Sequence, residues 1–170
     1  DSRIHSNVFD LVFSGGYLKS SIKQRGSLLD KVFKNGLILN NQSKILSSTL
    51  KSITAMKSIQ SHNGEKGCYR YIISNTQSSN NILEVLALLK LSGWQKPSVD
   101  IVPLFETIPD LKICAEIMEK MYNNTFYMFH LKRRNYEQTI MLGFSDGTKD
   151  GGYLTVSYTH LRAHETEADL

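Results

Sequence analysis

The chain has few of the residues that define specialised structural classes. Its 170 residues include two cysteines, three prolines and one tryptophan. Cys68 and Cys114 have neither the spacing of a metal site nor that of a redox motif, and two cysteines do not make a disulfide framework. Buried free thiols are the simpler interpretation, and they suit a reducing cytosol. We therefore expect a cytoplasmic location.

Long apolar runs and strong charge are also missing. No stretch is long enough to cross a bilayer, and the first residues do not resemble a signal peptide. The net charge of +4 is mild, and basic and acidic residues are mixed along the chain. This pattern gives no support to a nucleic-acid partner or a membrane partner. The 41% of hydrophobic residues is enough for the core of one folded domain.

The apolar pattern changes its period along the chain and predicts an α/β fold. Three apolar runs with the length of buried strands lie near residues 69–74, 99–105 and 138–144. Segments with helical period separate them, and a further helical segment near residues 17–35 is predicted to break at Gly26 and to end at Gly36. Strands joined by long helical crossovers are parallel, with right-handed connections. Three strands are too few to close a barrel, so both an arc of a (β/α)8 barrel and an open doubly wound sheet remain possible.

A glycine-rich loop follows the third predicted strand, in the stretch QTIMLGFSDGTKDGG at 138–152. The loop is not a nucleotide-binding P-loop, because no Gly-Lys-Ser/Thr follows at the required spacing. It is not an EF-hand either, because the twelfth position of such a loop is Ser157 rather than Glu. Two roles remain: Asp146 can hold a hard cation, and Lys149 can hold an anion. An ordinary solvated turn is the alternative.

A second carboxylate follows the strand predicted in VDIVPLFET, residues 99–107. Glu106 stands at the end of this run. Parallel strands place their carboxyl ends at one edge of a sheet, so Glu106 and Asp146 can meet there and offer oxygen ligands to Mg²⁺ or Mn²⁺. The alternative for Glu106 is a residue that stabilises the start of the next helix.

These stretches together resemble bacterial phosphoenolpyruvate carboxylase. The resemblance rests on VDIVPLFET and QTIMLGFSDGTKDGGYL, with RYIISNTQSSNNILEVLALLK and SGGYLKSSIKQRGSLLDKVF, and it covers roughly residues 9–155. Members of this family are several times longer than this chain. The resemblance therefore implies that residues 1–155 are an internal fragment of the carboxylase domain, a TIM-type barrel with many extra helices.

The resemblance also implies a function. The family is a lyase that carboxylates phosphoenolpyruvate with bicarbonate to oxaloacetate and phosphate, an anaplerotic reaction that needs Mg²⁺ or Mn²⁺. Glu106 and Asp146 would be the metal ligands, Lys149 the catalytic residue that holds bicarbonate, and Asp150 an orienting residue. The fragment is expected to be inactive alone, and the full-length family is usually a homotetramer. The alternative is a non-catalytic α/β module that binds a divalent cation.

The end of the chain departs from the family pattern. Its sequence includes SYTHLRAHET, which resembles the translation of a sequencing adaptor. His160 and His164 are four residues apart and could share a metal on one helix face, but the adaptor interpretation explains them without a metal. We interpret residues 156–170 as a non-native tail.

Overall fold

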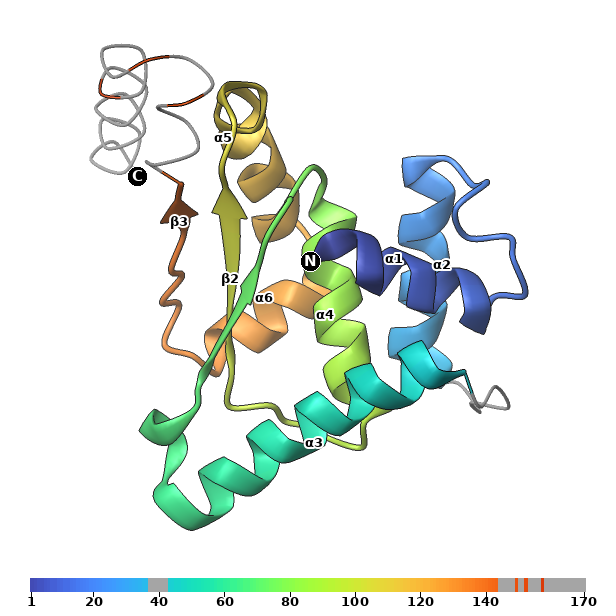
Figure 1. The fold of residues 1–170 in the computed structure, drawn as a ribbon, viewed down its shortest axis with the longest axis vertical. Helices are drawn as coiled ribbons and strands as arrows, with labels where there is room; N and C mark the ends of the chain where they lie inside the picture. The colour runs from blue at the N-terminus through green and yellow to red at the C-terminus, as the bar shows by residue number, and fades with distance from the viewer. Residues whose placement is uncertain (37–42, 144–148, 150–151, 153–156, 158–170) are drawn as a thin grey trace.

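The computed structural model describes residues 1–36 and 43–143, together with 149, 152 and 157. Helices and a short parallel sheet alternate along this part of the chain (Figure 1). The elements are α1 (Ser2–Val12), α2 (Ile22–Asn35), α3 (Lys44–Asn63), the 3-10 turn η1 (Glu65–Gly67), β1 (Arg70–Ile73), α4 (Ser79–Leu91), β2 (Asp100–Phe105), α5 (Ile108–Tyr122), α6 (Thr125–Lys132) and β3 (Met141–Leu142).

The sheet is parallel, as the sequence predicted, and its strands follow one another in the order β1-β2-β3. Figure 1 shows α4 beside the strands and α3 across the end at which β1 and β2 begin. Both α4 and α5 pack against β2. Right-handed crossovers that always advance in the same direction place their helices on the same face of a sheet.

The two faces of the sheet differ in exposure. On the face toward the helices, Ile73, Ile101 and Phe105 are buried. On the other face, Ile72 is 49% exposed and Met141 is 43% exposed. Parallel sheets are normally covered on both faces. The second face is thus exposed on the flanking strands at Ile72 and Met141, whereas Val102 of the central strand is only 2% exposed on that face.

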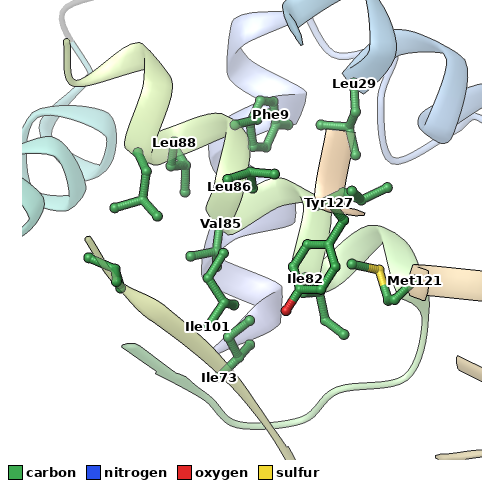
Figure 2. Close-up of a cluster of buried hydrophobic side chains, with 14 of the residues drawn as sticks. Phe9, Leu29, Ile73, Ile82, Val85, Leu86, Leu88, Ile101, Met121 and Tyr127 are labelled. Atoms are coloured by element: carbon green, nitrogen blue, oxygen red, sulfur yellow. The ribbon is translucent and has the colours of Figure 1, made fainter. Parts of the chain in front are cut away.

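The core is centred on α4. Its residues from Ile82 to Leu89 are all buried, which explains why this segment is apolar around nearly its whole circumference. Figure 2 shows Val85 near Ile73 and Ile101 of the sheet, while Leu86 lies near Phe9 of α1. The helix therefore has one layer of neighbours on the sheet side and another on the side of α1 and α2.

Two predicted boundaries were wrong. The third strand was predicted over 138–144, but the described part of it covers only Met141–Leu142. Before it, the Gln138 side-chain amide donates to the carbonyls of Ile101, at 3.0 Å, and Thr139, at 2.8 Å. A side chain therefore replaces the backbone ladder in linking this segment to β2.

The predicted break at Gly26 was also wrong, because α2 runs through it from Ile22 to Asn35. A glycine inside a helix costs about 1 kcal/mol relative to alanine. A capping box between Ser21 and Gln24 offsets part of this cost. Gly26 also faces α4 closely, since a β-carbon there would lie 3.4 Å from the Asn80 side-chain oxygen. The predicted end at Gly36 is confirmed.

Of the helices in the described ranges, none combines the length and the apolar character that crossing a bilayer requires. The longest, α3, has 20 residues but carries several lysines along its exposed side.

Candidate active site at the carboxyl edge of the sheet

The three strands end at one edge of the sheet, and the two predicted motifs meet there. Glu106 directly follows β2, and Gly143 directly follows β3. The Gly143 N–H donates to the Phe105 carbonyl at 2.8 Å, which continues the pairing of the strands by one residue. The half-buried Glu106 is thereby fixed beside the start of the glycine-rich loop.

Gly143 is packed directly against Glu106. A β-carbon on Gly143 would lie 2.9 Å from the Glu106 Cα and 3.1 Å from its Cγ. A side chain at position 143 would therefore occupy the space in which the Glu106 side chain leaves the backbone. This close approach explains why a glycine follows the strand.

The remaining predicted residues follow Gly143 in the chain, and Lys149 among them is helical rather than part of a loop as the sequence predicted. Asp146 and Asp150 lie outside the described residues, and Lys149 is described and exposed. Among the residues that the structure describes, no cluster of three or more His, Cys, Asp or Glu side chains could hold a metal. The structure thus places Glu106 at the edge of the sheet, and its pairing with Asp146 stays a prediction. The Glu106 carboxylate is the type of oxygen ligand that a hard cation such as Mg²⁺ or Mn²⁺ prefers.

The start of α1 also lies near this edge, which the sequence did not predict. The Ser2 N–H donates to the Ser74 carbonyl at 3.1 Å, and the Ser2 hydroxyl donates to the Asn75 carbonyl at 2.6 Å. The start of α1 and the turn after β1, 73 residues apart in the chain, are therefore in contact here. No local pattern in the sequence predicts this contact.

Arg3 brings an exposed cation to the same part of the molecule. Its guanidinium pairs with the Asp1 carboxylate at 2.6 Å, and its side chain is 75% exposed. A guanidinium presents several N–H donors in a plane that suits phosphate and carboxylate groups. Arg3 thus presents exposed N–H donors near this edge of the sheet.

A buried carboxylate, also missed from the sequence, lies in the central helix α4. Glu84 of α4 is fully buried and accepts hydrogen bonds from the hydroxyls of Ser6, at 2.9 and 3.0 Å, and Tyr17, at 2.9 Å. Burial raises the pKa of Glu84 to about 7, and the hydroxyl donors oppose this shift. Glu84 therefore joins α1 and the turn before α2 to the central helix. It was missed because the surrounding segment was interpreted only through its apolar residues.

A carboxylate at the carboxyl edge of a parallel sheet, beside the residue at which a glycine-rich segment begins, lies where α/β enzymes place their chemistry. Comparison with known proteins specifies the class further. The family described as phosphoenolpyruvate carboxylase matches residues 1–170. The chain belongs to the phosphoenolpyruvate carboxylase family, and the resemblance seen in the sequence is confirmed.

Three curated relatives, each called phosphoenolpyruvate carboxylase, illustrate the match. The protein from Nitrosomonas eutropha is 32% identical over an alignment of 190 residues that covers 100% of this chain and 20% of the relative. The protein from Corynebacterium diphtheriae is 44% identical over 95 residues, or 56% of this chain and 10% of the relative. A protein from Prochlorococcus marinus is 35% identical over 132 residues, or 72% and 13%. The chain thus spans a fifth or less of the length of these relatives.

Proposed function

We propose that this chain forms part of an enzyme that carboxylates phosphoenolpyruvate with bicarbonate, giving oxaloacetate and phosphate. The enzyme is a carboxy-lyase in this proposal. The observation that carries it is the position of Glu106 beside Gly143, which brings the two motifs of the family resemblance to one edge of the sheet. Because the chain spans only 10–20% of the length of two of the relatives, we expect it to be inactive alone.

The same proposal includes the barrel. Crossovers that advance in one direction, as in β1-β2-β3, place helices on one face and leave the other face toward the interior of a closed barrel. A doubly wound sheet reverses its direction and covers both faces with helices. The exposed Ile72 and Met141 support the first arrangement. They would pack against the remaining strands of a (β/α)8 barrel.

Each of the candidate residues has a distinct role in this proposal. Glu106 and Asp146 would hold Mg²⁺ or Mn²⁺, which when bound supplies Lewis-acid chemistry to the substrate oxygens. Lys149 would hold bicarbonate by its charge, and Arg3 would attract the phosphate or carboxylate of phosphoenolpyruvate. We expect the full-length enzyme to be a cytoplasmic homotetramer with neither a nucleic-acid nor a membrane partner.

The metal role is tested in a full-length carboxylase that contains this segment. Glu106→Gln and Asp146→Asn should each raise the Mn²⁺ concentration needed for half-maximal activity, by about tenfold or more. Glu116→Gln is the matched control, because Glu116 is an exposed carboxylate of α5 that pairs with Lys120. An unchanged metal titration in both site variants would exclude the proposed ligands.

The second candidate is a non-catalytic α/β module that binds a divalent cation. It shares the Glu106 and Asp146 ligands but requires no carboxylation. If Mn²⁺ binds to the full-length protein with the predicted dependence on these residues, and no oxaloacetate forms from phosphoenolpyruvate and bicarbonate, the module is the correct interpretation.

A further inference from the structure

A groove lies between α2, α4 and α6, away from the carboxyl edge of the sheet. It consists of two adjoining hollows that share Lys90 and Gln95 in their walls. One hollow, of about 320 Å³, lies against α6; the other, of about 330 Å³, lies against the end of α2. Neither of the motifs discussed above contributes to this groove, which we call the α4–α6 groove.

The charged side chains of the groove are all cations. Lys34, Lys90 and Arg133 line it, and no carboxylate does so among the described residues. None of the three forms an ion pair within the described part of the chain. His130 is also in the wall, but burial lowers its pKa to about 4, so it is neutral at physiological pH. The groove therefore favours an anionic partner.

Aromatic rings hold the central cation and form the apolar part of the surface. The Lys90 ammonium lies 5.3 Å from the centroid of the Phe33 ring and 6.0 Å from that of Phe126, and these rings stack at 4.8 Å. Cation–π attraction at such distances favours this position of the ammonium. Phe129, also in the wall, is 65% exposed. An exposed phenylalanine beside a cationic hollow suits a partner that carries both apolar and acidic groups.

We propose that the α4–α6 groove binds an acidic amphipathic segment of the carboxylase polypeptide that lies outside these 170 residues. An apolar side chain of that segment packs on Phe129, and its carboxylates face Lys34, Lys90 and Arg133. Two adjoining hollows fit an elongated segment better than a compact anion. An amphipathic helix that lies in a groove is a common way to bury such a surface. The inference rests on the family membership, because up to nine-tenths of a relative's length lies beyond the part that this chain matches.

The first test uses a synthetic amphipathic helix of about 18 residues, or five turns, with leucines on one face and glutamates on the other. A matched peptide has lysines in place of the glutamates. The acidic peptide should bind the 170-residue chain, and the basic peptide should bind about tenfold more weakly or not at all. Equal affinity for the two peptides would overturn the proposal.

Variants locate the binding in the groove. Lys90→Glu should weaken binding of the acidic peptide about tenfold and strengthen binding of the basic one. Phe129→Ser alters an exposed residue and should weaken both, while folding is checked by circular dichroism. Lys51→Glu on the exposed side of α3 is the control and should change binding little. If neither groove variant alters the affinity, the groove is not the binding site.

The source of the segment is tested by hydrogen exchange. The amides of residues 125–133 should exchange about tenfold more slowly in a full-length family member than in the 170-residue chain. Equal exchange would exclude a segment of the same polypeptide. Self-association of the chain that Phe129→Ser abolishes would instead identify a second copy as the occupant. None of these readouts depends on metal or carboxylation, so their failure leaves the proposed reaction untouched.

Discussion

Gly143 lies so close to Glu106 that a β-carbon on the glycine would be 2.9 Å from the Glu106 Cα. The two residues follow adjacent parallel strands, and the Gly143 N–H donates to the carbonyl of Phe105. The closeness is thus set by the pairing of the backbones rather than by flexible side chains. Any residue larger than glycine must either move the strand ends apart or displace the carboxylate.

We predict that Gly143→Ala weakens metal binding without removing a ligand. Forcing a methyl group into packed backbone costs about 1–3 kcal/mol, and here the strain falls on Glu106. In a full-length carboxylase, the Mn²⁺ requirement should therefore rise while the protein stays folded. Gly16→Ala is the control, because its β-carbon would meet only the Phe13 carbonyl at 3.5 Å. Equal metal titrations of the two variants would contradict this role of Gly143.

Lys149→Ala should affect the two substrates differently. If the ammonium holds bicarbonate, its loss should raise the KM for bicarbonate by about tenfold or more and that for phosphoenolpyruvate by much less. Steady-state kinetics of a full-length enzyme with each substrate varied in turn give the comparison. Lys112→Ala, an exposed lysine of α5, serves as the control. A similar rise in both KM values would mean that the lysine has a structural role instead.

Glu84 should make stability depend on pH. Burial raises its pKa from 4.5 to about 7. Between these values the unfolded chain releases the proton while the folded chain retains it, so the contribution of Glu84 to stability falls as pH rises. Over this range the loss is on the order of 2–3 kcal/mol. Glu84→Gln keeps an oxygen acceptor for Ser6 and Tyr17 but removes the titration.

The measurement is urea unfolding at several pH values, followed by the fluorescence of Trp94, the single tryptophan, which is 8% exposed. His5 and His130 titrate in the opposite sense, because burial lowers the pKa of each to about 4. At each pH, the free energy of unfolding of the unchanged chain is subtracted from that of Glu84→Gln, and this subtraction cancels the contribution of the two histidines. This difference should become more positive from pH 4.5 to 7, because only the unchanged chain loses the contribution of Glu84. A constant difference would refute the prediction.

Much of the fold followed from local patterns in the sequence. Apolar runs located β1 and β2 to within a residue of their observed ends, and Gly36 ended α2 as predicted. Pro109 lies in the first turn of α5, as expected for a residue without a backbone N–H. These features depend on residues near one another in the chain, and such signals are visible in a single sequence.

Contacts between distant residues could not be predicted in this way. Before β3, the Gln138 amide donates to the Ile101 carbonyl, 37 residues away, where the sequence predicted a longer strand. α2 continues through Gly26, where it packs against Asn80 of α4, a residue distant in the sequence. For the candidate site, the sequence predicted that Glu106 would lie at the edge of the sheet, and the structure places it there. The approach of Arg3 to the same edge depends on hydrogen bonds from Ser2, for which the sequence held no local signal.

The opposite edge of the sheet, where the strands begin, is held by Arg134, and its removal should destabilise the chain. The Arg134 Nε donates to the Asp100 carboxylate at 2.7 Å, and its Nη1 donates to Glu65 in η1. The side chains of Arg134 and Asp100 are 15% and 13% exposed, so the pair is largely shielded from water.

Arg134→Met leaves the Asp100 carboxylate without its partner and should lower the free energy of unfolding by about 1–3 kcal/mol. Urea unfolding gives this value, with the exposed Lys132→Met as the control, expected to change it by less than about 0.5 kcal/mol. Equal stabilities of the two variants would mean that solvent replaces the ion pair at no cost, and that packing alone fixes the start of β2.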